Sequence, residues 1–361
     1  MSVRLSRTRA GALAATAALA ATALTGASAS SVEAVTTVPV SKTPPRHLDP
    51  GALSRGADPR VPYLVGDQIR DGAVRVNVGP RANHLSLWET ATGYLLLDQL
   101  RSNGRLMRLT AYDRDGSSYV VARGSWLTVV VSPDKRRVVV TDDVRGGLGP
   151  FVVTVVNPTT GRELGSRSFR YADPVGVDDT KVVLNRMTAD HDIVSAAWRY
   201  ERNTLNRISG RRLQDTDLLQ RIFVFAGIGD GGGQGCARIT RSYDISRTLW
   251  RPCRYEPSDW SRDGDHALAT WDYFDMAGTD RWLVANGRTG DKQRWIFGRL
   301  DWVAVWEDND HFLTMAQGDD GDRAIIRCSV QGPCERASRL WDGRINEDLY
   351  YTAPPALLAQ N

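Results

Sequence analysis

The chain has 361 residues, of which 42% are hydrophobic, and its 46 basic and 42 acidic residues give a net charge of +4. A chain of this length can bury a large core, or more than one. Positive charge is nowhere concentrated into a basic stripe, so we expect no nucleic-acid partner.

Residues 1–29 predict a secretory signal peptide. Arg4, Arg7 and Arg9 precede an uncharged run that ends at Leu24, and Ala27-Ser28-Ala29 offers small residues of the A-x-A kind. The run is too short and too weakly apolar to span a membrane. We therefore expect cleavage after Ala29, which lowers the net charge from +4 to +1. The mature chain is expected to be secreted or associated with the cell envelope, with no membrane span.

The mature chain is expected to begin with a linker. Residues 30–60 are rich in Ser, Thr, Pro and Gly and show neither a helical nor a strand period, which predicts an extended or disordered segment. One domain follows at 61–354, and 355–361 is expected to be a short tail.

Basic residues are almost all arginine, a bias that suits a GC-rich bacterial genome such as an actinobacterial one. Lysine stands only at Lys42, Lys135, Lys181 and Lys292.

From Pro62 onward the sequence predicts strands. Short runs of β-branched and aromatic residues alternate with period two and end at Gly, Asp, Asn or Pro, as in "FVVTVVN" from Phe151 and "RIFVFAG" from Arg221. No run of 12 or more residues has a convincing helical period, and the best helical candidate, Leu213–Gln220, is too short. An all-β chain is expected.

Hairpin turns recur at regular spacing. Successive turns are 42 to 45 residues apart, at Asp71-Gly72, Asp115-Gly116, Thr160-Gly161, Asn203-Thr204, Asp244–Ser246, Thr289-Gly290 and Gln331-Gly332. A second series of turns lies between them, with one member not visible: Ser132–Lys135, Asp178–Lys181, Asp263–Asp265 and Asp308–Asp310. A period near 40–45 with four short strands in each unit is typical of a β-propeller, because radially stacked sheets bury faces that a single sheet leaves exposed.

Seven turns predict a seven-bladed β-propeller. Six blades would be continuous, beginning near Ala82, Trp126, Asp173, Thr216, Asp259 and Asp301. The N- and C-terminal strands would share the seventh, with two outer strands from Pro62–Val78 and inner strands from Arg344–Ala353. A six-bladed β-propeller with an extra N-terminal hairpin is the alternative.

Three segments carry a resemblance to known proteins. They are "VVVSPDKRRVVV" at Val129–Val140, "WSRDGDHALAT" at Trp260–Thr270 and "TVVNPTTGREL" at Thr154–Leu164. The chain from Pro62 to Ala353 resembles secreted bacterial propellers of the TolB-like and YVTN-like, broadly WD-repeat-like, kind. The resemblance implies the fold repeat and no particular activity. The Gly-His opening of WD repeats is absent from this sequence.

The four cysteines predict two disulfides in an exported chain. Cys236 and Cys253 are centred on the turn expected at Asp244–Ser246, and Cys328 and Cys334 are centred on Gln331. The expected pairs are therefore Cys236–Cys253 and Cys328–Cys334, each across its own hairpin.

The strongest candidate for a binding surface is the set of loops opposite the seven turns. These loops are long and rich in Gly and Asp, and they would gather one rim of carboxylates: Asp142, Asp143, Asp190, Asp192, Asp230, Asp272, Asp275, Asp280, Asp319, Asp320 and Asp322. Such a rim suits a hard cation such as Ca²⁺, or a basic partner. Solvated turn aspartates are the alternative, and neighbouring arginines such as Arg281 and Arg323 would dilute the field.

Other motifs in the sequence give weaker indications of function. "GIGDGG" at Gly227–Gly232 leads into a strand instead of a helix, so we interpret it as a flexible loop. No catalytic residue is assigned, since no nucleophile elbow or zinc motif is present. A group of tryptophans could form a sugar-stacking surface but is more often packing between blades. They are Trp260, Trp271, Trp282, Trp295, Trp302 and Trp306.

The leading hypothesis is an exported, non-enzymatic propeller scaffold, a monomer without a cofactor except for the Ca²⁺ already considered. It would bind a protein, small-molecule or glycan partner through the Asp-rich loop face. The first alternative is a carbohydrate-active enzyme with paired carboxylates in the central funnel, with Asp272, Asp275 and Asp319 as candidates. The second is a structural cell-envelope protein.

Overall fold

The computed structural model describes residues 47–79, 82–100, 106–143, 149–227, 235–271, 279–341 and 356–360. The chain divides into two units, Met1–Pro44 and Pro45–Asn361, and all described residues belong to the second. The expected signal peptide and the first part of the expected linker lie outside the described residues. Apart from one 3-10 turn, η1 (Pro50–Ala52), every regular element in the described part is a strand. No helix in the described part of the chain is long and apolar enough to cross a membrane.

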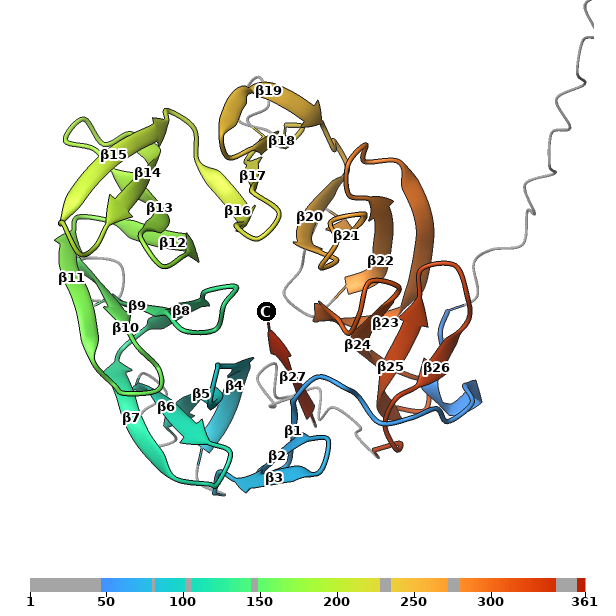
Figure 1. Cartoon of the computed structure of the whole chain (residues 1–361). Coiled ribbons are helices and arrows are strands. Elements are labelled where there is room, and N and C mark those ends of the chain that lie inside the picture. The colour runs from blue at the N-terminus through green and yellow to red at the C-terminus, as the bar shows by residue number, and fades with distance from the viewer. Residues whose placement is uncertain are drawn as a thin grey trace, which may run out of the picture. The chain divides into compact units, whose positions relative to one another are not determined.

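The strands form five antiparallel-rich sheets that stand around a central axis (Figure 1). The eight-stranded sheet contains two groups of four strands, and the seven-stranded sheet contains two groups of four that share one strand. With the three four-stranded sheets, the described strands form seven groups, here called blades 1 to 7. This arrangement fits the expected seven-bladed ring. Blade 1 consists of β4 (Ala82–Glu89), β5 (Gly93–Leu100), β6 (Met107–Asp113) and β7 (Ser118–Gly124), and blade 2 consists of β8 (Leu127–Val131), β9 (Val138–Asp143), β10 (Phe151–Val156) and β11 (Glu163–Phe169). Blade 3 consists of β12 (Ala172–Val177), β13 (Val182–Met187), β14 (Ile193–Arg199) and β15 (Thr204–Ser209). Blade 4 consists of β16 (Leu213–Asp217), β17 (Ile222–Phe225), β18 (Arg238–Arg241) and β19 (Asp244–Trp250).

Blades 5 and 6 share one long strand, β23 (Lys292–Trp306). Its first part, Lys292–Leu300, pairs with β22 as the outermost strand of blade 5, and its last part, Ala304–Trp306, pairs with β24 as the innermost strand of blade 6. The other strands of these blades are β20 (Tyr255–Trp260), β21 (His266–Trp271), β22 (Thr279–Asn286), β24 (His311–Gln317), β25 (Arg323–Ser329) and β26 (Cys334–Arg336).

Blade 7 joins the two ends of the chain. The innermost strand is β27 (Ala356–Gln360), and β1 (Tyr63–Val65), β2 (Gln68–Asp71) and β3 (Val74–Asn77) follow outward. β27 also makes a parallel contact with β4 of blade 1. The N-terminus thus supplies three strands where two were expected, and β27 stands where a short tail was expected. The segment Arg344–Ala353, expected to close the ring, lies outside the described residues.

Local turn chemistry explains why the repeat is visible in the sequence. In blades 1, 2, 5 and 7 the turn between the third and fourth strands holds a glycine in the left-handed region, as at Gly161 with φ 70°, and in blade 3 Asn203 takes that role with φ 49°. Such a backbone is cheap for Gly and tolerable for Asn. The turn of blade 4 lies at Ser242–Tyr243, ahead of the expected Asp244–Ser246, which instead begins β19.

The turn missing from the second series lies between β16 and β17. It spans Leu218–Arg221, and Arg221 takes φ 56° where a glycine would be usual. The Asp217 carboxylate accepts a hydrogen bond from the Gln220 N–H at 2.8 Å. The turn is therefore stabilised by a side chain without Gly, Pro or Asn, which is why it leaves no signal in the sequence.

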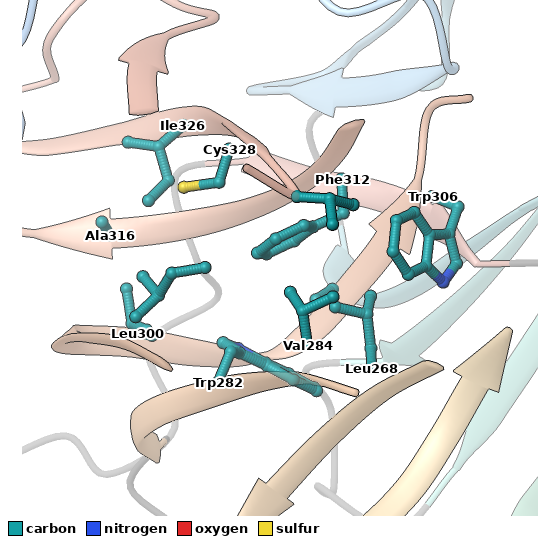
Figure 2. Close-up of a cluster of buried hydrophobic side chains, with 12 residues drawn as sticks. Leu268, Trp282, Val284, Leu300, Trp306, Phe312, Ala316, Ile326 and Cys328 are labelled. Carbon is teal, nitrogen blue, oxygen red and sulfur yellow. The ribbon is translucent and has the colours of Figure 1, made fainter. Parts of the chain in front are cut away.

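The core consists of side-chain layers between neighbouring blades. Figure 2 shows one such layer, in which Trp282 and Leu268 of blade 5 pack with Phe312 and Ile326 of blade 6. Trp260, Trp282 and Trp306 are at most 6% exposed. These tryptophans therefore fill the wedge between blades, as the packing interpretation expected, while Trp302 remains 47% exposed.

Part of the expected linker is ordered on blade 6. Arg336 of β26 donates its N–H to the Ser54 carbonyl at 2.8 Å, and Arg55 forms a parallel bridge with Arg336. The buried Arg327 guanidinium donates to Glu307 Oε1 at 2.8 Å and to the Asp58 carbonyl at 3.1 Å. This segment covers the outer edge of blade 6, which would otherwise present unpaired backbone groups.

Candidate functional site

The connections lie on two opposite faces of the propeller, because successive strands of each blade run in opposite directions. The turn face carries the connections between the first and second strands and between the third and fourth. The pocket face carries the connections between the second and third strands, and the links from one blade to the next. The Asp-rich loops belong to the pocket face.

The structure distributes the expected aspartates over separate blades. Asp230, Asp272 and Asp275 lie outside the described residues. Asp190 and Asp192 are exposed in the turn after β13, and Asp319 and Asp320 are exposed in the turn after β24. The remaining candidates lie at strand ends, at Asp142, Asp143, Asp280 and Asp322.

No cation site follows from this placement. Among the described residues, no group of three or more His, Cys, Asp or Glu side chains has the spacing needed to hold a metal ion. Asp319 is 97% exposed and lies 3.9 Å from Arg299, while Asp280 forms a hydrogen bond of 2.8 Å to Arg281. Binding of Ca²⁺ stays a prediction that depends on the three aspartates outside the described part.

Two exposed tryptophans mark the pocket face. Trp126 is 62% exposed in the link between blades 1 and 2, and Trp302 is 47% exposed in β23 where the chain passes from blade 5 to blade 6. The strands that carry or follow them, β8 and β23, lie on different sides of the central axis (Figure 1). Burial of an exposed indole by a partner is favourable, so exposed indoles on one face are typical of binding surfaces.

A carboxylate stands beside each tryptophan. Asp142 accepts backbone hydrogen bonds from Ser125 and Trp126, and burial raises the pKa of this carboxyl against the effect of those bonds. Burial likewise raises the pKa of Asp301, which accepts a hydrogen bond from the Val303 N–H at 3.3 Å. Of these two carboxylates, Asp142 was expected on this face and Asp301 was not.

A pocket of about 300 Å³ opens on the same face between blades 4 and 5. Its polar lining residues are Arg212 and Gln214 from the start of blade 4, and Tyr255 and Glu256 from the start of blade 5. Gly227, Gly235 and Cys253 complete one wall. The volume suits a small molecule, at the lower end of ordinary ligand sites.

Both expected disulfides are present, and one belongs to the pocket. Cys236 is bonded to Cys253, and Cys328 is bonded to Cys334. The first bond ties the start of β18 to the link between blades 4 and 5. It therefore fixes the wall of the pocket to which Cys253 contributes.

Sequence reasoning missed a group of carboxyls on the innermost strands. Asp215 follows a bulge in β16, and Asp259 holds the same position after a bulge in the adjacent β20. Burial raises the pKa of Asp215 to about 8, and burial with the charges of Asp217 and Asp215 raises the pKa of Asp259. No salt bridge to these carboxyls occurs in the part of the chain that the structure describes.

The sequence offered only a weak signal for this group. The best helical candidate, Leu213–Gln220, is too short for a helix, and its first five residues, "LQDTD", form the inner strand β16, in agreement with the expected all-β chain. The alternation of Asp215 and Asp217 in a run of strand length was the available sign. Their neighbourhood depends on the adjacent blade, which a local pattern does not show.

No protein-family model and no curated protein matches the sequence. Solved structures similar in fold include an oligogalacturonate lyase from Vibrio parahaemolyticus, with TM-score 0.51 and 11% identity over 78% of this chain and 90% of the lyase. The β-propeller domain of the trilobed protease from Pyrococcus furiosus has TM-score 0.49 and 10% identity over 80% and 99%. TolB from Acinetobacter baumannii has TM-score 0.40 and 13% identity over 76% and 73%. The chain is therefore an all-β propeller, a fold that it shares with the oligogalacturonate lyase.

Proposed function

We propose that the protein is an exported, non-enzymatic propeller that binds a glycan through its pocket face. The observation that carries the proposal is the exposure of two indoles, those of Trp126 and Trp302, on the pocket face. An indole face packs against the C–H face of a sugar ring. Because the two indoles belong to different blades, an extended ligand suits them better than a single sugar.

Two further features support this proposal. Disulfides persist in oxidising compartments, so the two bonded cysteine pairs support export and an extracellular or envelope location. A pocket on the same face as the indoles favours binding over a purely structural envelope role.

The test is binding of the mature chain to a panel of soluble cell-wall glycans by isothermal titration calorimetry. We expect Trp126→Ala and Trp302→Ala each to weaken binding at least tenfold, which corresponds to about 1.4 kcal/mol. Tyr243→Ala is the matched control, because Tyr243 is 73% exposed on the turn face. Equal weakening by all three variants, or a panel without any bound glycan, would contradict the proposal.

The second candidate is a carbohydrate-active enzyme. It is favoured by the raised pKa of Asp215, to about 8, since a glycosidase needs a carboxyl that stays protonated as its acid. The pKa of the neighbouring Asp259 is raised as well, so the ionised carboxylate would have to come from elsewhere. Of the originally expected candidates, Asp272 and Asp275 lie outside the described residues, and the exposed Asp319 lacks the desolvation that an acid catalyst needs. Glycan cleavage by the wild type that Asp259→Asn abolishes without loss of binding would favour this candidate.

A further inference from the structure

We infer that the disulfide between Cys236 and Cys253 is a thiol-exchange site, at which a dithiol reductant releases one wall of the pocket between blades 4 and 5. The bond holds this wall in place when it is oxidised, and its reduction frees the wall. The inference does not rest on the glycan proposal, because it concerns neither Trp126 nor Trp302.

The two disulfides of the protein differ in their access to solvent. Cys236 and Cys253 are both exposed, and Cys253 also lines the pocket. Cys328 is 0% exposed and belongs to the core layer between blades 5 and 6, against which the half-buried Cys334 packs. A thiolate must reach a sulfur atom to attack a disulfide, and exposed disulfides are accordingly the labile ones. The fold therefore leaves the first bond open to exchange and protects the second.

The wall that reduction would free is the link from blade 4 to blade 5, residues 251–254. Strand pairing ends with Trp250 of β19 and begins again with Tyr255 of β20. Between them, no hydrogen bond joins the backbone of 251–254 to the backbone of another residue that the structure describes. Apart from the packing of the buried Pro252, the disulfide is what holds this link. Segments with few backbone hydrogen bonds open at low free-energy cost.

The opposite wall, which carries Cys236, is held independently of the disulfide. The carbonyl oxygen of the preceding residue, Gly235, would lie 1.9 Å from a Cβ atom at Gly227, so the two backbones are in close contact where only glycine fits. Gly227 in turn follows Ala226, whose N–H donates to the Arg212 carbonyl at 3.0 Å. Reduction is therefore expected to leave this wall in place and to release only the link.

The exchange takes place in two steps and needs a dithiol. One thiolate of the reductant attacks a sulfur of the Cys236–Cys253 bond and forms a mixed disulfide, while the other cysteine leaves as a thiolate and takes up a proton. The second thiol of the reductant then attacks the mixed disulfide, which releases the remaining cysteine and closes a disulfide within the reductant. Two electrons thus pass to the protein, which gains two thiols, and the disulfide form of the reductant reverses the exchange.

The first experiment measures which bond a dithiol opens in the folded protein. The intact mature chain is incubated with graded dithiothreitol without denaturant, its thiols are trapped with N-ethylmaleimide, and the labelled cysteines are mapped by mass spectrometry. We expect Cys236 and Cys253 to be labelled together, roughly tenfold or more faster than Cys328 and Cys334. Equal rates, or earlier labelling of the buried pair, would overturn the inference.

The same reaction in urea separates the effect of the fold from that of the local sequence. Once the chain is unfolded, both bonds are open to solvent and should be reduced at similar rates. A difference between the two bonds that persists in urea would contradict the explanation by exposure.

The second experiment follows the link by limited proteolysis. Arg254 is an exposed residue of the link at which trypsin can cleave, and Arg202 is an exposed arginine in the outer turn of blade 3. After reduction and trapping, cleavage at Arg254 should become roughly tenfold or more faster, because proteolysis follows the population of the open form. Cleavage at Arg202 should not change.

A paired variant tests the same link without a reductant. Cys236→Ser combined with Cys253→Ser should show the fast cleavage at Arg254 from the start, with no further increase on addition of dithiothreitol. Unchanged cleavage at Arg254 in the reduced wild type, or an equal increase at Arg202, would overturn the inference. Neither result depends on whether the protein binds a glycan.

Discussion

Leu64 of β1 pairs with Leu357 of β27, so one blade is built from the two ends of the chain. This pairing turns an open row of blades into a closed ring. In a closed ring, neighbouring blades cover both faces of blade 7, and both of these faces are apolar. On one side Leu358 packs with Tyr63, Val305 and Leu313 of the last core layer.

The closing strand is expected to contribute strongly to stability. Leu358 is 6% exposed, so Leu358→Ala removes buried methyl groups and should lower the free energy of unfolding by about 2–4 kcal/mol. Urea denaturation of the mature chain measures the change. Leu219→Ala is the control, because Leu219 is 57% exposed and should change the free energy by less than about 0.5 kcal/mol. Equal effects of the two variants would argue that β27 does not close the ring.

The two disulfides should contribute unequally. Cys236 and Cys253 are 17 positions apart and Cys328 and Cys334 are 6 apart. A longer loop loses more entropy on closure in the unfolded chain, which predicts about 3 kcal/mol for the first bond and about 2 kcal/mol for the second. Paired Cys→Ser variants compared by thermal and urea unfolding test this order. A larger loss for the Cys328–Cys334 pair would contradict the loop-entropy explanation.

The ion pair between Arg327 and Glu307 should anchor the N-terminal segment to blade 6. The Glu307 side chain is fully buried and that of Arg327 is 9% exposed, so Glu307→Gln leaves a buried guanidinium with only the partly exposed Glu335 as its counter-charge. We expect a loss of about 3 kcal/mol and faster proteolysis within 47–60. Arg60→Ala is the control, because this arginine is 62% exposed and its contact with Glu307 should be worth less than about 1 kcal/mol.

The same pair predicts a loss of stability in acid. Burial alone would raise the pKa of Glu307, but the hydrogen bonds and charges of Arg327 and Arg60 lower it below its usual value. The folded state therefore binds this proton less readily than the unfolded chain does. The stabilising contribution is present above the unfolded pKa and is lost as pH falls through the folded pKa. The Glu307→Gln variant should show less of this loss than the wild type.

Asp215 should act in the opposite direction. Its pKa is raised to about 8, so between the ordinary aspartate value and pH 8 the folded chain holds a proton that the unfolded chain has released. Stability should accordingly fall as pH rises through this window. Asp215→Asn should be more stable than the wild type at pH 9 and no more stable at pH 3, as followed by thermal melting. A constant difference at both pH values would show that the carboxyl does not titrate in this window.

Features that depend on neighbouring residues along the chain could be predicted from the amino-acid sequence. The turns at Gly72, Gly116, Gly161 and Gly290 place this residue in the left-handed region, which favours glycine. The regular spacing of these glycines therefore indicated a repeat of four strands and an all-β ring. The cysteine pairs followed from the same hairpins. The Leu218–Arg221 turn escaped because Asp217 stabilises it without any special turn residue.

The strand that closes the ring and the carboxyls that lose their hydration are set by contacts between residues far apart in the chain. "ALLAQ" at 356–360 has no pattern that assigns it to β1, and the pairing arises because the seventh blade lacks an inner strand. Asp215 and Asp259 are ordinary aspartates in the sequence, and their pKa values rise only when β16 and β20 stand side by side around the axis. Burial and charge depend on residues distant in the chain, and a local pattern contains no information about them.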